Sequence, residues 1–297
     1  GIDYLSQKQF ENKVELIKDD IRWFDPKILD EVDVVIDLAA LSNDPVGDLD
    51  PAKTYEINHL GRARVSKLSK ERGVSRYILA SSASIYGQQE EVVDENAAIK
   101  PLTAYSKANR KAEESALPLN DDSFTVTALR FSSVYGISPR MRFDTAVNVM
   151  VLDLFNKGKI TVRGQGKKRP FVHILDVARA YEVVINASKE KIGGQIFNVG
   201  SDEQNYEMGQ LAKEITNGVG EECQLELEDS PDHRSYTASF SKIRENLNFV
   251  PNYTVKQGAK EIYEALKSGA LKETKKTKTV EWYKTLLSDK SLAQDII

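Results

Sequence analysis

The sequence of 297 residues predicts an α/β fold, in which a doubly wound parallel sheet is accompanied by a smaller mixed α/β lobe. Short runs rich in Val, Ile, Leu and Phe alternate along the chain with helical patterns. Nearly continuous apolar strands separated by helices indicate a parallel sheet that is covered on both faces. The runs that we predict to be strands are residues 14–17, 32–40, 77–81, 124–131 and 195–199.

Two helices with clear ends separate these strands. The first spans residues 51–72, with Asp50 as its N-cap and Pro51 as its first helical residue, and it closes at Gly73. The second spans residues 103–116 and ends before Pro118, whose ring does not fit inside a helix.

The pattern changes after Gly136 to shorter, more polar segments, and after Gly200 it becomes helical with one strand at residues 224–228. We therefore expect two interleaved units. Residues 1–136 and 170–200 would form the sheet domain, and residues 137–169 and 201–297 the smaller lobe.

The composition excludes several classes of protein. A formal net charge of −4 argues against a nucleic-acid partner, because binding to a phosphate backbone requires clustered Lys and Arg. No stretch is apolar for long enough to span a bilayer, so we expect no membrane role. A single cysteine, Cys223, excludes an intramolecular disulfide, and no His spacing suggests a metal site. We expect a cytoplasmic enzyme.

A serine and a tyrosine follow successive strands in a pattern that suggests proton chemistry. Ser82 comes at the end of one strand, and Tyr105 lies at the start of the next helix. In a parallel sheet both would face the edge where doubly wound folds bind ligands. There a serine hydroxyl can bond a substrate oxygen while a phenol transfers a proton during hydride transfer. Either residue alone is more often a loop serine or a half-buried tyrosine; the combination favours the functional interpretation.

The strand at residues 32–40 ends in Ala39 and Ala40, which would let a ligand approach its carboxyl end. Taken alone, close packing of a helix against this Ala pair explains the residues equally well.

Eight segments, in order, resemble the NAD-dependent epimerase/dehydratase family of extended short-chain dehydrogenases/reductases. They are Asp19-Asp20-Ile21-Arg22, Asp37-Leu38-Ala39-Ala40, Asn58, the run from Ser81 to Gly87, Leu129-Arg130-Phe131, the run from Arg169 to His173, Asp176-Val177-Ala178 and Phe197-Asn198-Val199-Gly200. The resemblance covers almost the whole chain. It implies a Rossmann-type fold, NAD as cofactor with NADP as the alternative, a nucleoside-diphosphate sugar as substrate, and a homodimer built through the helices at 51–72 and 103–116.

The resemblance also implies a role for each residue that matches a family motif. Ser82 takes the position of the catalytic Ser/Thr and Tyr105 that of the catalytic tyrosine, while Asp20 and Ile21 would border the adenine ring. The implied cofactor-binding residues are Asp20, Ile21, Leu38, Ala39, Ala40, Asn58, Tyr105 and Asn109. The implied substrate-binding residues are Ser82, Ser84, Arg142, Asn148, Arg169 and Arg234.

The segments at 138–144 and 232–236 are similar to the branch that acts on nucleoside-diphosphate sugars. Guanidinium groups bind a pyrophosphate with two charge-assisted bonds each. We place Arg169 and Arg234 there, and Arg142 nearer the sugar or its phosphate. Family dehydratases carry an acidic pair directly after the catalytic Ser/Thr, where this chain has Ala83 and Ser84. Dehydration is therefore disfavoured.

One departure from the family concerns the catalytic tyrosine. The family motif has a lysine four residues after it, and this chain has Asn109. Lys107 and Lys111 point to other sides of the helix. With a phenol near pKa ~10, loss of the cation predicts weak catalysis or an alkaline pH optimum. The alternative that Asn109 supports is a sugar-nucleotide or dinucleotide-binding protein with little or no activity.

A second departure is that no glycine-rich turn joins a strand to a helix, as cradling of a pyrophosphate requires. Gly164-Gln165-Gly166 precedes a basic run and a proline instead. We expect the chain to start after the second strand of the family fold. The function that the sequence favours is reversible oxidation of a sugar hydroxyl, expected at C4, leading to epimerisation or to net oxidation or reduction.

Overall fold

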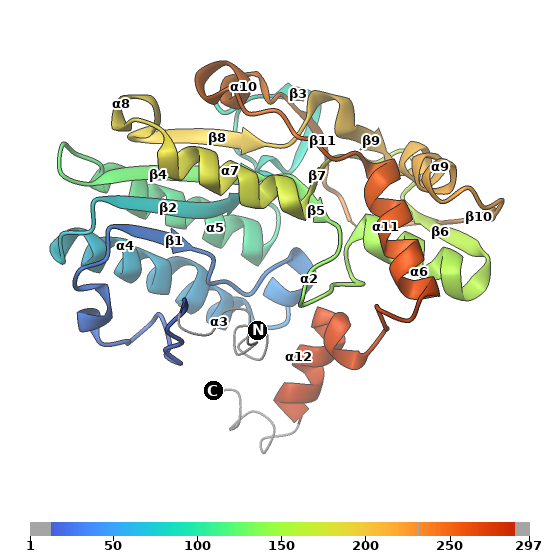
Figure 1. Cartoon of the computed structure of the whole chain (residues 1–297), viewed down its shortest axis with the longest axis horizontal. Helices are drawn as coiled ribbons and strands as arrows, with labels where there is room; N and C mark the ends of the chain where they lie inside the picture. The colour runs from blue at the N-terminus through green and yellow to red at the C-terminus, as the bar shows by residue number, and fades with distance from the viewer. Residues whose placement is uncertain (1–12, 231, 289–297) are drawn as a thin grey trace.

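The centre of the structure, a computed structural model that describes residues 13–230 and 232–288, is a parallel sheet of strand order β1-β2-β4-β8 (Figure 1). The strands are β1 (Val34–Asp37), β2 (Arg76–Ser82), β4 (Thr125–Phe131) and β8 (Gln195–Val199). Four of the five predicted strands are therefore confirmed, with small differences at their ends. The predicted parallel sheet is confirmed as well.

The prediction of a strand at residues 14–17 was wrong. This run forms neither helix nor strand, and Val14, Leu16 and Ile17 are 44%, 42% and 48% exposed. A strand needs a neighbour to bond its N–H and C=O groups. Among the described strands β1 pairs only with β2, so this apolar run has no strand beside it.

Helices cover both faces of the sheet because side chains alternate along each strand. Tyr77 and Leu79 of β2 pack on one face with α4 (Arg62–Glu71) and α5 (Ala104–Ala116). Ile78, between them, packs on the other face with α7 (Ile174–Asn186), which crosses the sheet on the near side in Figure 1.

The helix predicted at 51–72 is continuous but changes its winding. It consists of α3 (Pro51–Tyr55), a π-helical turn η3 (Glu56–Gly61) and α4. Asp50 caps its start, because its Oδ1 accepts a bond from the N–H of Lys53 at 2.9 Å. Gly73, at φ 80°, ends it in the left-handed region that favours glycine. The π turn adds a residue to the winding, so α4 is rotated against α3 by about 100°.

The second predicted helix, α5, starts with a reciprocal cap. The Thr103 hydroxyl accepts a bond from the N–H of Ser106, and the Ser106 hydroxyl accepts one from the N–H of Thr103 at 3.0 Å. This cap fixes the end of the helix that carries Tyr105. The homodimer expected through α4 and α5 stays a prediction that a solution molar mass would decide.

A second core lies beside the sheet, to the right in Figure 1. It is built from α6 (Ala146–Lys157), β6 (Lys159–Arg163), α9 (Met208–Val219) and α11 (Val255–Lys267). The exposed strand β10 (Gln224–Glu228) pairs with β6 beside this core. The strand predicted at 224–228 is confirmed as β10. The remaining helical segments are η2 (Pro26–Leu29), α2 (Asp44–Gly47), η4 (Ala83–Tyr86), η5 (Leu117–Leu119), α8 (Lys189–Ile192), η6 (Asp202–Gln204), α10 (Ser241–Leu247), η7 (Lys275–Thr277) and α12 (Thr279–Ser288).

Two small sheets connect the sheet domain to the lobe. In one, β5 (Ser133–Tyr135), β7 (Lys168–His173) and β9 (Asn205–Glu207) lie side by side; in the other, β3 (Gln88–Val93) pairs with β11 (Ser235–Ala238). We expected residues 170–200 to belong to the main sheet, and this prediction was wrong for β7. Its partners are β5 and β9, and the chain rejoins the main sheet at β8.

A buried ion pair joins α5 to the sheet. Arg130 on β4 donates from Nε to Glu113 Oε1 at 2.9 Å and from Nη2 to Oε2 at 2.8 Å. Ser81 at the end of β2 donates to the same carboxylate at 2.6 Å. The Arg130 and Glu113 side chains are 1% and 0% exposed. The pair therefore holds α5, β2 and β4 in one arrangement.

Removing the carboxylate would leave a buried guanidinium without its partner. We expect Glu113→Ala to lower the free energy of unfolding by about 3–5 kcal/mol, measured by urea denaturation. Glu114→Ala is the matched control, since Glu114 is 51% exposed and pairs only with Arg110 on the surface. It should cost at most about 1 kcal/mol. Equal losses in the two variants would contradict this role of Glu113.

Candidate active site

A cleft of about 670 Å³ lies at the carboxyl ends of β1, β2 and β4 and reaches into the smaller lobe. It brings together most of the residues that the sequence singled out. From the sheet domain these are Leu38, Ala40, Ser82, Ser84, Tyr105 and Asn109, and from the lobe side Arg142, Asn148, Arg169 and Arg234. Ligand binding at this edge is the rule for doubly wound sheets.

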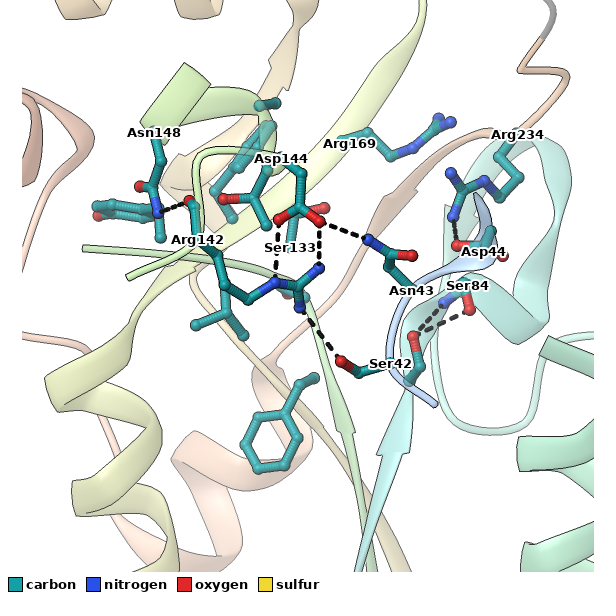
Figure 2. A pocket seen from close by; sticks show the side chains of 18 of the residues that line it. Ser42, Asn43, Asp44, Ser84, Ser133, Arg142, Asp144, Asn148, Arg169 and Arg234 are labelled. Carbon is teal, nitrogen blue, oxygen red and sulfur yellow. Dashed lines mark hydrogen bonds and ion pairs between the residues drawn. The ribbon is translucent and has the colours of Figure 1, made fainter. Parts of the chain in front are cut away.

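Ser82 ends β2 and is held by the turn that follows. Its Oγ accepts a bond from the N–H of Ser84 at 3.2 Å and donates to Ser84 Oγ at 2.9 Å (Figure 2). Ser84 is 4% exposed. The two hydroxyls thus form one short polar chain at the strand end.

Tyr105, in the first turn of α5, borders the cleft. Burial raises the pKa of its phenol, and the Asp44 carboxylate raises it further. The Arg62 guanidinium and hydrogen bonds with Ser82 and Asn109 act in the opposite direction without cancelling the increase. Gly47 lets α2 approach this residue, because a Cβ at position 47 would lie 2.8 Å from the Tyr105 Cβ. Ser82, Tyr105 and Asn109 therefore meet at one point, as the sequence predicted.

Asn109 is buried, and both ends of its amide are in use. Its Nδ2 donates to the Tyr105 carbonyl at 3.0 Å, and its Oδ1 accepts a bond from Arg62 Nη1 at 2.9 Å. A guanidinium therefore lies beside the position where the family has its lysine. The sequence analysis did not identify Arg62.

Of the arginines that line the cleft, the three that the sequence singled out are each paired with a carboxylate. Arg142 binds Asp144 at 3.0 Å (Figure 2). Arg234 binds Asp232 at 2.6 Å and also contacts Asp44. These bonds orient the guanidinium groups before any ligand is present.

Arg169 is the most buried of the three, at 8% exposure, and shares Asp232 with Arg234 at 3.1 Å. Burial lowers the pKa of Arg169, and the charge of Arg234 contributes to the decrease. Burial alone would raise the pKa of Asp232, but its bonds to Arg234 and the charges of both arginines hold it well below its ordinary value. Arg234 also contacts Asp44, so the two cations in this part of the cleft are paired with two carboxylates.

The side-chain amides of Asn148 and Asn58 are both bonded to backbone groups of neighbouring segments. Asn148 accepts a bond from the N–H of Gly136 and donates to the Arg142 carbonyl at 2.9 Å. Asn58 bonds both backbone groups of Leu41, at 2.8 and 3.0 Å, which holds the loop after β1.

Asp20, Ile21 and Ala39 are not among the residues that line the cleft. Asp20 binds Arg22 at 2.6 Å. Ile21 packs beneath Gly61, where an added Cβ would be 2.8 Å from its Cδ1. Contacts of these residues with an adenine ring stay a prediction.

Six charged residues that line the cleft were not identified as site residues from the sequence: Asp44, Arg62, Asp144, Arg163, Lys167 and Asp232. A signal existed for one of them. Asp37 ends an apolar strand and is 4% exposed, and a buried carboxylate requires a partner. Arg62 is that partner, with its Nε 3.3 Å from Asp37 Oδ1.

His173 is 1% exposed and stacks on Tyr253 with ring centroids 4.5 Å apart, so it is a core residue. Within the described residues no cluster of three or more His, Cys, Asp or Glu side chains is arranged to hold a metal ion. In the same residues no helix combines the length and apolarity that a bilayer span needs.

Solved structures share this fold. MoeE5, in complex with UDP-glucuronic acid and NAD, superimposes with a TM-score of 0.76 at 23% identity, covering 85% of each chain. The UDP-glucuronic acid 4-epimerase of Bacillus cereus, in complex with UDP-glucuronic acid and NAD, gives a TM-score of 0.77 at 22% identity, covering 88% of this chain and 84% of that one. The chain therefore has the Rossmann-type α/β fold of these structures.

The NAD-dependent epimerase/dehydratase family matches residues 6–200, and the chain belongs to that family. Among its relatives are the uncharacterized UDP-glucose epimerase YtcB of Bacillus subtilis, 25% identical over 84% of this chain and 79% of that protein, and the UDP-glucuronate 4-epimerase of Thermodesulfobacterium geofontis, 25% identical over 77% and 71%. The dTDP-D-glucose 4,6-dehydratase of Mus musculus is 26% identical over 86% and 69%. The resemblance seen in the sequence motifs is confirmed.

Asp144 offers a test of the charge pairing in the cleft. Burial alone would raise its pKa, but the charge of Arg142 and bonds from Arg142 and from Thr279 lower it. A carboxyl whose folded-state pKa is lowered stabilises the fold above its unfolded value of ~3.9, and loses that contribution as pH falls through the folded value. Asp144→Asn should therefore lower the free energy of unfolding at pH 7 by about 1–2 kcal/mol.

The difference between wild type and Asp144→Asn should shrink at pH 3, as measured by urea denaturation at both pH values. Asp30→Asn is the control, because Asp30 is 51% exposed and pairs with Arg72 on the surface. A difference that stays constant between pH 7 and pH 3 would argue against the pairing.

Proposed function

We propose that this protein oxidises a hydroxyl of a nucleoside-diphosphate sugar reversibly, at C4, and acts as an NAD-dependent epimerase or oxidoreductase. The observation that supports this most is that Ser82 and Tyr105 line one cleft together with arginines of the smaller lobe. A site that only binds a nucleotide sugar has no need of that pair.

The residues at the sheet edge fit the nicotinamide and ribose end of the cofactor. Leu38, 64% exposed, and Ala40 face the cleft beyond β1, where small or open positions admit a planar ring. Tyr105 and Asn109 lie opposite, on α5. When bound there, NAD accepts a hydride from the sugar carbon and returns it.

Proton transfer would be the work of the protein. Tyr105 takes the proton of the sugar hydroxyl as the carbonyl forms, and Ser82 donates a bond to the same oxygen. The Ser82–Ser84 bond orients the serine for this. Return of hydride to the other face of the ketone gives an epimer, and release of the keto-sugar gives a net oxidation.

The arginines favour a diphosphate on the substrate. Arg169 and Arg234 are paired with Asp232 and Asp44, and Lys167 lines the same cleft, so three cations face two carboxylates and positive charge remains for an anion. Arg142 lies on the segment between β5 and α6 and would face the sugar or its phosphate. Relatives named as UDP-sugar epimerases support the same substrate class.

Epimerisation is favoured over dehydration. Elimination of water needs an acid and a base next to the reacting carbons, and Ser82 is followed by Ala83, which is buried, and by Ser84. The rival interpretation, a binding protein of little or no activity, rests on Asn109.

The direct test incubates the protein with NAD and a panel of UDP-, GDP-, CDP- and dTDP-sugars, following nicotinamide absorbance and sugar identity by NMR. An inverted sugar without net NADH indicates an epimerase, and stoichiometric NADH with a keto-sugar indicates a dehydrogenase.

We expect Tyr105→Phe to lower turnover by about 10²–10⁴-fold with little change in sugar-nucleotide affinity, because only the proton transfer is removed.

The control is Tyr263→Phe, which alters a tyrosine that packs on Phe155 in the smaller lobe. It should leave turnover unchanged. Binding of a nucleotide sugar without any conversion between pH 7 and 10 would refute the enzyme proposal and support the binding protein instead.

A further inference from the structure

A buried guanidinium lies next to the reactive pair. Arg62 opens α4 directly after the π turn, is 1% exposed, and contributes to the lining of the cleft. Placing a charge in the interior is costly unless it is paired and hydrogen-bonded. Its contacts therefore show what the position is built to hold.

Arg62 connects three elements at the sheet edge. Nη1 donates to Asn109 Oδ1 at 2.9 Å, and Nη2 donates to the carbonyls of Asp37, at 3.2 Å, and of Ala80. Nε lies 3.3 Å from Asp37 Oδ1. The guanidinium is thus fixed between β1, β2 and α5, with one edge turned to the helix of Tyr105.

We propose that Arg62 provides, from α4, the fixed positive charge that the family lysine provides from position 109, and that it acts on Tyr105 through and alongside Asn109. This rests on the proposed function, in which Tyr105 takes a proton. Arg62 is a positioning residue, because Asn109 lies between it and the reacting atoms.

Asp37 does not simply cancel this charge. Its carboxylate also accepts bonds from the Tyr77 hydroxyl and from the N–H of Ala39, at 3.2 Å, on the side of β1. The ionisable groups that act on Arg62 are Asp37, Tyr77, Tyr105 and Tyr181. Those that act on Tyr105 are Asp44, which raises the pKa of the phenol as burial does, and Arg62, which lowers it.

The identity of residue 109 is consistent with this arrangement. A lysine there would bring a second cation to the place where Arg62 now bonds Oδ1, and like charges at that range repel. An asparagine instead accepts the guanidinium N–H and still bonds the Tyr105 carbonyl at 3.0 Å. The charge has therefore moved to another helix rather than disappeared.

The test removes the charge without leaving its partner unpaired. In the variant Arg62→Gln/Asp37→Asn, kcat with NAD and the best nucleotide sugar of the panel should fall about tenfold or more at pH 7. The acid limb of the pH profile should move up by about one pH unit or more. Adding Asn109→Lys should bring the limb back. Arg64→Gln is the control, since Arg64 lies on the same helix but bonds the Phe24 carbonyl at 3.1 Å.

A second readout does not depend on turnover. In protein labelled with ¹³Cζ-tyrosine and free of ligands, the Tyr105 resonance, assigned with Tyr105→Phe, should titrate at higher pH in the double variant and return with Asn109→Lys. Should the double variant fail to fold, Arg62→Lys replaces it and should keep the wild-type limb.

In the double variant, an unchanged acid limb and an unchanged Tyr105 titration would overturn the proposal, as would a loss of kcat that Asn109→Lys does not reverse. In Arg62→Lys, an acid limb that moves away from its wild-type position would overturn it. If no nucleotide sugar is converted by the wild type, the proposed function fails. The Tyr105 titration then still decides whether Arg62 acts on the phenol.

Discussion

The buried pair of Arg130 and Glu113 fixes the geometry on which the site depends. Glu113 lies on α5, the helix that carries Tyr105 in its first turn, and the serine that bonds its carboxylate, Ser81, precedes Ser82. Any movement of α5 against β2 would therefore stretch bonds to a charge that has no water to replace them. The position of Tyr105 relative to Ser82 is therefore set by the buried Arg130–Glu113 contact.

Charge pairing across elements is repeated throughout the cleft. Arg62 joins α4 to β1 through Asp37, Arg142 and Asp144 close the segment before α6, and Arg234 reaches from the lobe to Asp44 on α2. The last contact spans the two sides of the cleft, and Asp44 in turn acts on Tyr105. The arginine Arg234 of the lobe and Tyr105 are thus electrostatically connected through Asp44.

The sequence was sufficient for the sheet because each strand had to be apolar on both faces to lie between helices. It was also sufficient for the meeting of Ser82 and Tyr105, since the carboxyl ends of parallel strands share one edge. It was not sufficient for residues 14–17, where an apolar run alone does not show that a strand lies beside it. Helical periodicity counted from Pro51 would also misplace the side chain of Arg62, because the π turn at Glu56–Gly61 rotates α4 relative to α3. Asp144 and Asp232 lie two residues from Arg142 and Arg234. The contacts of Arg234 with Asp44, 190 positions away, and of Arg169 with Asp232 are tertiary and leave no spacing signal.

The pairing of the cleft arginines with carboxylates has a consequence for selectivity. A ligand entering this cleft meets guanidinium groups that are already ordered, so little conformational entropy is lost on binding. It must, however, compete with Asp144 and Asp232 for the same N–H groups. A neutral or singly charged molecule gains little from that exchange, whereas a group carrying two or more negative charges can displace one carboxylate and still satisfy both cations. The resident anions thus set a lower limit on the charge of what the cleft retains.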